Sequence, residues 1–228
     1  MDIIGTGIYP LHQAARLVGA EPRALRRWLY GYSRKHKDGH VRSEPLWPTQ
    51  LKDEDLPGEV IGFRDLLEAR MVAAFVRHGV DLKVIRATIA TASHDFSVGY
   101  PLTQRQFLTD GKRIFMEAVE TATGESRMID VLRKQFVFSD IIKPSLYAGI
   151  EYDVDGAVRW FPLERRTVVL DPTVQFGTPI VAHAGIPTDT IYASYLAEGR
   201  NEAMVARVFD ITSQMVADAI EFEEKLAA

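Results

Sequence analysis

The chain has 228 residues and no cysteine. Disulfides, iron–sulfur clusters, thiolate zinc sites and cysteine nucleophiles are therefore excluded. No apolar run reaches about 18 residues, so the sequence predicts no transmembrane helix. It does not open with a basic start, an apolar core and a cleavage site, so we expect no signal peptide. This profile is typical of a protein of the reducing cytoplasm.

Composition places the chain among globular proteins. Hydrophobic residues make up 46% of it and charged residues 25%, which is close to the globular average. A disordered, collagen-like or low-complexity protein is excluded, and the length favours one or two domains.

Charge is distributed unevenly along the chain, although the net charge is only −4. Residues 1–42 hold eight basic and three acidic side chains, a balance of +5, whereas residues 167–228 hold three basic and nine acidic ones, a balance of −6. This asymmetry indicates that the amino end meets a polyanion. The alternative is two solvated surfaces of opposite sign.

Residues 8–30 predict two short helices. The apolar positions of the first follow one helical face, and they are Leu11, Ala14, Ala15 and Val18. Gly19 suits a left-handed helix end, and Pro22 suits the first turn of the next helix. Leu25, Trp28 and Leu29 form the second apolar stripe. Two helices joined by such a turn are typical of a helix-turn-helix.

A hairpin and two further helices are expected next. Ser33 to Gly39 is polar and basic with an Asp38-Gly39 turn, which predicts a hairpin, or wing, followed by an irregular connection over 44–57. An amphipathic helix is predicted over 63–77. Asp81 can cap another helix that carries Leu82, Ile85 and Ile89.

The middle region, residues 98–170, is expected to be rich in β-hairpins and to be a candidate dimerisation region, with partner binding as the alternative role. Its signals are two Asp-Gly turns, Asp110-Gly111 and Asp155-Gly156, each flanked by β-prone residues. Phe136 to Phe138 predicts another short strand. No long dimerising helix is expected after residue 95.

The last region, 171–228, predicts three helices over about 188–197, 201–208 and 212–226, with Asn201 and Thr212 as caps. The fold class is therefore α+β, with domains at 1–97, 98–170 and 171–228. The final helix carries acidic residues that phosphate should repel, namely Asp218, Glu221, Glu223 and Glu224. We interpret this module as a protein–protein or dimerisation unit.

The second helix carries the chemistry expected of a DNA reader. Arg23, Arg26 and Arg27 lie at i, i+3 and i+4, so they share a face opposite the apolar stripe. Arginine can be bidentate to guanine or to phosphate. The alternative is an ordinary solvated helix face. The candidate DNA-binding residues of helix and wing are Arg23, Arg26, Arg27, Tyr30, Arg34, Lys35, Lys37 and Arg42.

Catalysis is not favoured by the sequence. The six histidines are scattered, and His36 and His40 flank a turn rather than share a helix face. No Gly-rich phosphate loop, nucleophile elbow or paired-carboxylate motif occurs. We therefore expect no enzyme, no metal and no cofactor.

Ile8 to Tyr30, together with the helices at 63–77 and 81–92, resembles the winged helix-turn-helix of MerR-type regulators. The matching residues are Leu11, Ala15, Leu17, Gly19, Arg23, Leu25, Arg26, Trp28, Tyr30, Gly79, Leu82 and Ile85. The resemblance implies that the helix-turn-helix reads DNA, the wing touches the backbone and the later helix pair supports both. Without cysteine or a long dimerising helix, a metal-sensing regulator is not favoured.

The carboxyl end is similar to a small domain of unknown function found in VapB-type antitoxins. The matching segments are Asp171-Pro172, Phe176 to Val181, Ile186 to Thr188, Glu198-Gly199, Val205-Ala206, Phe209 to Thr212 and Ala219-Ile220. The resemblance implies an antitoxin of a type II toxin-antitoxin system, which represses its own promoter as a homodimer and neutralises a PIN-type ribonuclease.

Two other functions stay open. The first is a MerR-like transcription regulator without a toxin partner. The second is a ligand-binding or enzymatic module, in which aromatic residues of the middle region line a pocket, namely Phe136, Phe138, Trp160 and Phe161. Core packing explains these aromatic residues better. The toxin-contacting residues, the operator and the dimer interface are not predicted.

Overall fold

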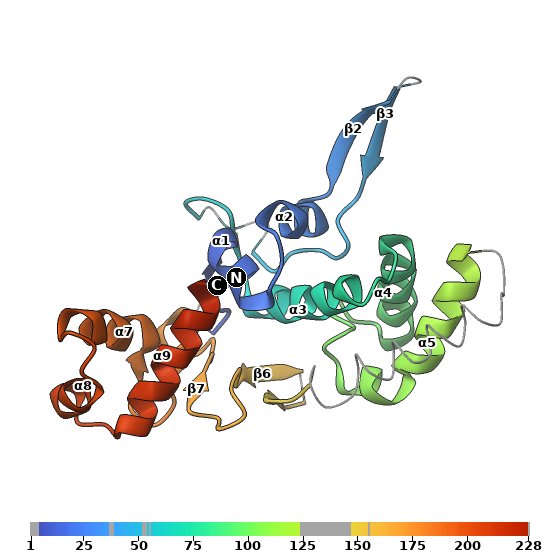
Figure 1. The fold of residues 1–228 in the computed structure, drawn as a ribbon. Helices are drawn as coiled ribbons and strands as arrows, with labels where there is room; N and C mark the ends of the chain where they lie inside the picture. Colours follow the sequence, from blue (N-terminus) through green and yellow to red (C-terminus); the bar gives the residue numbers. More distant parts are fainter. Residues whose placement is uncertain are drawn as a thin grey trace. The chain divides into compact units, whose positions relative to one another are not determined.

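The computed structural model describes residues 5–36, 39–51, 54, 56–123, 147–154 and 156–227. The chain divides into two compact units. The first spans Tyr9–Tyr147, and the second joins Met1–Ile8 to Ala148–Ala228. The α+β class is confirmed, with helices and small sheets in both units (Figure 1). These units do not follow the expected boundaries at residues 97 and 170.

The two predicted helices of the amino end are confirmed. A short strand, β1 (Tyr9–Pro10), leads into α1 (Leu11–Val18), and α2 (Pro22–Tyr30) follows. The four predicted apolar positions of α1 are buried, as is the Leu25, Trp28 and Leu29 stripe of α2. Gly19 ends α1 in the left-handed conformation that glycine adopts without strain.

The predicted wing is an antiparallel hairpin that extends from the end of α2 (Figure 1). It consists of β2 (Tyr32–His36) and β3 (Gly39–Ser43), whose register runs from Tyr32 opposite Ser43 to His36 opposite Gly39. Asp38 of the expected turn lies outside the described residues. Gly31 joins α2 to the wing at φ 72°, and a Cβ there would lie 2.3 Å from the Ser43 carbonyl oxygen. Only glycine fits this junction.

The helix pair that supports the helix-turn-helix is also confirmed. After β4 (Val60–Ile61), which pairs with β1, come α3 (Phe63–Arg77) and α4 (Leu82–Phe96). Most side chains of α3 are buried, so this helix is the centre of the unit. Asp81 caps α4 as predicted, because its carboxylate accepts a hydrogen bond from the Lys83 backbone N at 2.7 Å.

The hairpin predicted at Asp110-Gly111 is wrong. Those residues lie inside α5 (Arg105–Thr123), a long helix after residue 95 that packs beside α4; the expectation that no dimerising helix follows residue 95 stays a prediction. The buried residues of α5 follow a helical face, and they are Phe107, Gly111, Ile114, Phe115, Ala118 and Val119. The Phe115 ring stacks on Phe75 at 5.6 Å. Tertiary packing therefore outweighs the local turn signal. The strand expected at 136–138 lies outside the described residues.

The second unit contains the hairpin predicted around residues 155–156. Its strands are β5 (Ile150–Tyr152) and β6 (Ala157–Trp160), which pair antiparallel. Trp160 is buried, in agreement with a role in the core. A three-stranded sheet follows, formed by β7 (Val168–Val169), β8 (Ile180–Val181) and β9 (Ile186–Pro187), with the short 3-10 turn η1 (Gln175–Gly177) between β7 and β8.

The three predicted helices of the carboxyl end are confirmed. They are α7 (Thr188–Ala197), α8 (Glu202–Phe209) and α9 (Ser213–Ala227). Asn201 accepts a hydrogen bond from Met204 N at 3.1 Å and Thr212 one from Met215 N at 3.2 Å, so both predicted caps form. The three helices and β8 enclose one apolar core. Among the described residues, no helix is both long and apolar enough to cross a membrane.

Candidate nucleic-acid interface

Helix α2 has one buried and one exposed face. Its apolar stripe packs inward, and Trp28 further fixes the helix because its carbonyl accepts a hydrogen bond from Leu46 N at 2.8 Å. The three predicted arginines, Arg23, Arg26 and Arg27, are all exposed. The structure therefore places these three guanidinium groups together on the exposed face of α2, while the opposite, apolar face packs into the core.

One of the three arginines is already paired. Arg26 Nε lies 2.7 Å from Glu59 Oε1, and the two side chains are 59% and 45% exposed. An ion pair this exposed contributes roughly 0–1 kcal/mol, so a phosphate can displace Glu59 at small cost. Arg23 and Arg27 have no ion-pair partner among the described residues. The Arg27 guanidinium lies 5.4 Å from the centre of the Tyr32 ring, which orients it toward the base of the wing.

Tyr30 lies at the end of α2 and is 38% exposed. Its hydroxyl donates to the Val60 carbonyl at 3.4 Å, so it faces β4. Partial burial raises the pKa of Tyr30, and the nearby Glu59 carboxylate raises it further. The phenol is therefore neutral and leaves only part of its ring for a partner.

The wing contributes fewer described contacts. Arg34 and Lys35 lie in β2, opposite Val41 and His40, whereas Lys37 lies outside the described residues. Arg42 in β3 pairs with Glu44 at 3.0 Å, and both side chains are largely exposed. As with Arg26, this pair is weak enough to be exchanged for a phosphate.

Two arginines that were not singled out from the sequence, Arg86 and Arg77, hold the wing base and the turn before α2 in place. Arg86 of α4 donates to the carbonyls of Pro45 and Glu44, at 2.9 and 2.8 Å, and to Ser43 Oγ at 3.2 Å. Arg77 of α3 donates to the Val18 carbonyl at 3.1 Å, next to the turn between α1 and α2. The helix pair thus fixes both the turn and the wing base.

Lys83 is a further cation missed by sequence reasoning. It is exposed on the first turn of α4, close to Arg27 and Arg86, and it has no ion-pair partner in the part of the chain that the structure describes. Lys83 therefore extends the positive surface of α2 onto a second helix.

A buried carboxylate anchors the connection between wing and α3. Asp65 is fully buried and accepts hydrogen bonds from Trp47 Nε1, Gln50 N and Gly62 N at 2.9 to 3.0 Å. Burial raises the pKa of Asp65, although the three hydrogen bonds oppose that shift. Asp65 thereby fixes the irregular segment that follows the wing.

A second buried carboxyl, Glu68, lies one turn further along α3. One of its oxygens accepts hydrogen bonds from the backbone N and the hydroxyl of Thr103, at 3.1 and 3.0 Å. The other oxygen, Oε2, has no hydrogen-bond partner within the described residues. Burial raises the pKa of Glu68 to about 8, so the carboxyl is protonated at neutral pH.

The acidic face expected on α9 is smaller than predicted. Asp218 is buried and accepts from Arg165, Thr167 and Gln214, at 2.7, 2.7 and 2.9 Å. Burial alone would raise the pKa of Asp218, but these hydrogen bonds hold it below its usual value. Glu223 bonds the Thr188 hydroxyl at 2.5 Å.

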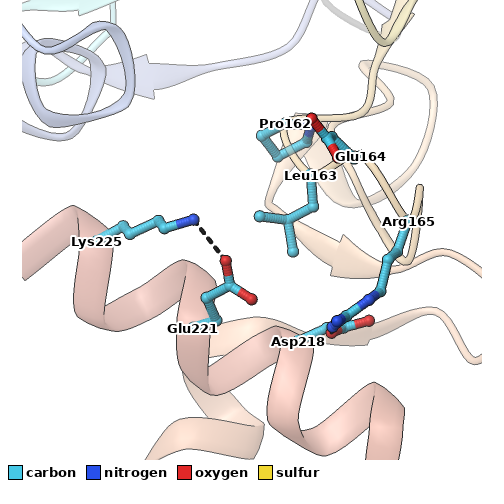
Figure 2. A pocket seen from close by; sticks show the side chains of 7 residues that line it. All are labelled: Pro162, Leu163, Glu164, Arg165, Asp218, Glu221 and Lys225. Atoms are coloured by element: carbon cyan, nitrogen blue, oxygen red, sulfur yellow. Dashed lines mark hydrogen bonds and ion pairs between the residues drawn. The ribbon is translucent and has the colours of Figure 1, made fainter.

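Asp218 lies at the edge of a mixed-charge hollow of about 290 Å³ (Figure 2). Figure 2 also shows Glu221 directed at Lys225, one helical turn away. The outward acids of α9 are therefore Glu221 and Glu224, and only Glu224 has no described partner. Within the described residues, no group of three or more His, Asp or Glu side chains is placed to hold a metal ion.

Comparisons with known proteins agree with this geometry at the amino end. Residues 7–89 match a family described as "Putative DNA-binding HTH domain". The first unit carries a helix-turn-helix domain. Residues 168–222 match a second family, "Protein of unknown function (DUF433)". Both matches coincide with the two regions where the sequence resembled known modules.

One solved structure extends the comparison to nearly the whole chain. The crystal structure of Rv2018 from Mycobacterium tuberculosis is 21% identical, covers 95% of this chain and 98% of its own, and superimposes with a TM-score of 0.70. At this identity the likeness shows a shared fold. No curated protein sequence matches the chain significantly.

Proposed function

We propose that this protein is the antitoxin of a type II toxin-antitoxin system, which binds operator DNA as a homodimer and neutralises a PIN-type ribonuclease. The observation that carries the DNA-binding part is the exposed arginine face of α2 on a helix-turn-helix. Arg23 and Arg27 have no ion-pair partners among the described residues. Two unpaired charges on one helix face do not stabilise the monomer, which favours a polyanionic partner for that face.

DNA recognition follows from the position of each cation. The face of α2 enters the major groove, where Arg23 and Arg27 reach base edges or phosphates. Arg26 and Arg42 exchange their exposed carboxylate partners for phosphate. Lys83 contacts the backbone beside the wing. Two copies place their α2 helices about one helical turn apart on a palindromic site.

The toxin-binding part of the proposal depends on the second unit. That unit carries the DUF433 module, which the sequence analysis found to resemble the carboxyl module of VapB-type antitoxins. Its helices expose large apolar side chains, Leu196, Met204 and Val208, at 48%, 39% and 58%. Exposed apolar side chains on adjacent helices are typical of a protein-binding surface.

A MerR-like regulator without a toxin is the second candidate. The helix-turn-helix, wing and supporting helix pair are sufficient for that function, and nothing in them requires a toxin. A neighbouring gene for a small acid-rich nuclease separates the two. Co-expression of the two gene products followed by sizing of the complex tests the partnership, and separate elution favours the regulator.

DNA binding is tested by titrating the full chain with its own promoter region. The double variant Arg23→Ala/Arg27→Ala should lose operator binding. Its matched control, Lys112→Ala/Arg200→Ala, also removes two exposed cations, but they lie outside α2 and the wing, so this variant should retain operator binding. Fluorescence anisotropy at several salt concentrations shows how many phosphates each variant still neutralises. Equal affinities for the two double variants would overturn the assignment of α2.

A further inference from the structure

A cleft of about 560 Å³ lies between α2, the base of the wing and the start of α4. All of its lining residues belong to the first unit. Its size falls within the range of small-molecule sites, which is about 300–1,000 Å³. DNA binding requires a positive outer surface but no such hollow, so the cleft calls for its own explanation.

Four cations line the cleft, and three of them, Arg27, Lys83 and Arg86, are not paired with a carboxylate among the described residues. Arg27 contacts the Tyr32 ring, and the described hydrogen bonds of Arg86 all go to neutral oxygens. Lys83 has no ion-pair partner among the described residues. The cleft's carboxylate, Glu44, is paired with Arg42. Three positive charges therefore remain to attract an anion.

The walls between these cations are apolar and aromatic. Trp28 and Leu46 are nearly buried and form part of the lining. Tyr32 and Leu82 stand 46% and 44% exposed at the cleft. Leaving such side chains in water is unfavourable by about 25 cal/mol for each Å² of apolar surface. A ligand with an apolar body would cover them.

We propose that this cleft binds a small aromatic anion, a planar apolar ring system that carries a carboxylate or sulfonate. The ring would lie against Tyr32 and Leu82, and the anionic group would face Arg27 and Lys83. Inorganic phosphate would neutralise the positive charges of the cleft, but it would leave the apolar side chains of its walls exposed to water. Because Arg27 also belongs to the candidate DNA interface, the bound anion would compete with the operator, a consequence that rests on the proposed function.

The test uses anilinonaphthalene sulfonate, whose fluorescence rises when it binds in an apolar site. The full chain should bind one equivalent saturably, whereas inorganic phosphate and the neutral N-phenylnaphthylamine should bind far more weakly. Leu82→Glu should weaken binding of the sulfonate at least about tenfold, because it adds a negative charge at the cleft. Lys83→Gln should weaken it through loss of a positive charge.

Leu108→Glu is the matched control. Leu108 is 40% exposed on α5, outside the cleft, so this variant should bind the sulfonate as the unmodified chain does. Absence of saturable binding, or equal affinity of Leu82→Glu and Leu108→Glu, would overturn the cleft assignment. Saturable binding that operator DNA fails to displace would overturn the competition. A chain that binds the sulfonate in the cleft but no DNA would overturn the proposed function alone.

Discussion

Arg26 on the outer face of α2 is joined at 2.7 Å to Glu59, a residue 33 positions away that precedes β4. The pair places a carboxylate beside the surface that we assign to DNA. If α2 binds DNA as we propose, Glu59 competes with phosphate for Arg26.

Removing this competitor should strengthen DNA binding. Glu59→Ala should raise operator affinity by about 1.4-fold to fivefold, since an exposed ion pair is worth about 0.2–1 kcal/mol. The change should also persist on non-specific duplexes, because phosphate contacts carry no sequence information. Salt-dependent anisotropy measures both. Glu120→Ala removes the same charge from α5 and should leave the affinity unchanged; a gain of the same size there would show that only net charge matters.

Glu68 should make the first unit less stable as pH rises. Its pKa is about 8 in the folded chain against 4.5 ordinarily, so the folded state holds the extra proton within that interval. Stability from this group is full below pH 4.5 and is lost as pH rises through about 8. Asp65, whose pKa is also raised, acts in the same direction.

Glu68→Gln should flatten this pH dependence. Urea unfolding at a series of pH values measures it in a Trp160→Phe background, where the two remaining tryptophans, Trp28 and Trp47, both lie in the first unit. Glu120→Gln, at an exposed position, should keep the slope of the unmodified chain. A slope that survives Glu68→Gln would contradict the assignment.

Asp65 should be among the most sensitive positions of the first unit. Asp65→Ala leaves the Trp47 ring nitrogen and two backbone nitrogens without their acceptor, which should cost about 3 kcal/mol or more of unfolding free energy. The exposed Asp110→Ala should change stability by less than about 1 kcal/mol. Urea unfolding followed by Trp fluorescence checks both, and comparable losses would argue against the hydrogen-bond account.

Asp218 should stabilise the second unit in the opposite pH direction. Its pKa is lowered in the folded chain, so its contribution is present above the ordinary value of 3.8 and is lost as pH falls below it. Asp218→Asn should lower the melting temperature at neutral pH and reduce its loss in acid. Calorimetry from neutral pH downward measures this. Glu221→Gln, one turn along α9, should melt like the unmodified chain, and a similar effect there would refute a specific role for Asp218.

Local signals predicted the helices of both ends. The apolar spacing of α1 to α4, the Asp81, Asn201 and Thr212 caps and the glycine after α1 all depend on residues a few positions apart. Such short-range information is present in a single sequence. The arginine face of α2 was predicted for the same reason.

Long-range contacts account for what was missed. The Asp110-Gly111 turn signal was outweighed by packing of α5 on α4 and by the Phe75–Phe115 stack, which joins α5 to α3. The Arg26–Glu59 pair and the buried Asp65 and Glu68 depend on residues brought together by the fold. A sequence shows these side chains as charged, and only the structure shows which of them are enclosed.

The three hydrogen bonds of Arg86 bear on how an operator is chosen. They attach the wing base to α4, while Arg77 attaches the turn before α2 to α3. The helix and the hairpin that we propose to contact DNA are thus held at a fixed separation by α3 and α4. A duplex must then supply the remaining adjustment by bending or by changing its groove width, so flexible base steps that touch no side chain should still raise affinity.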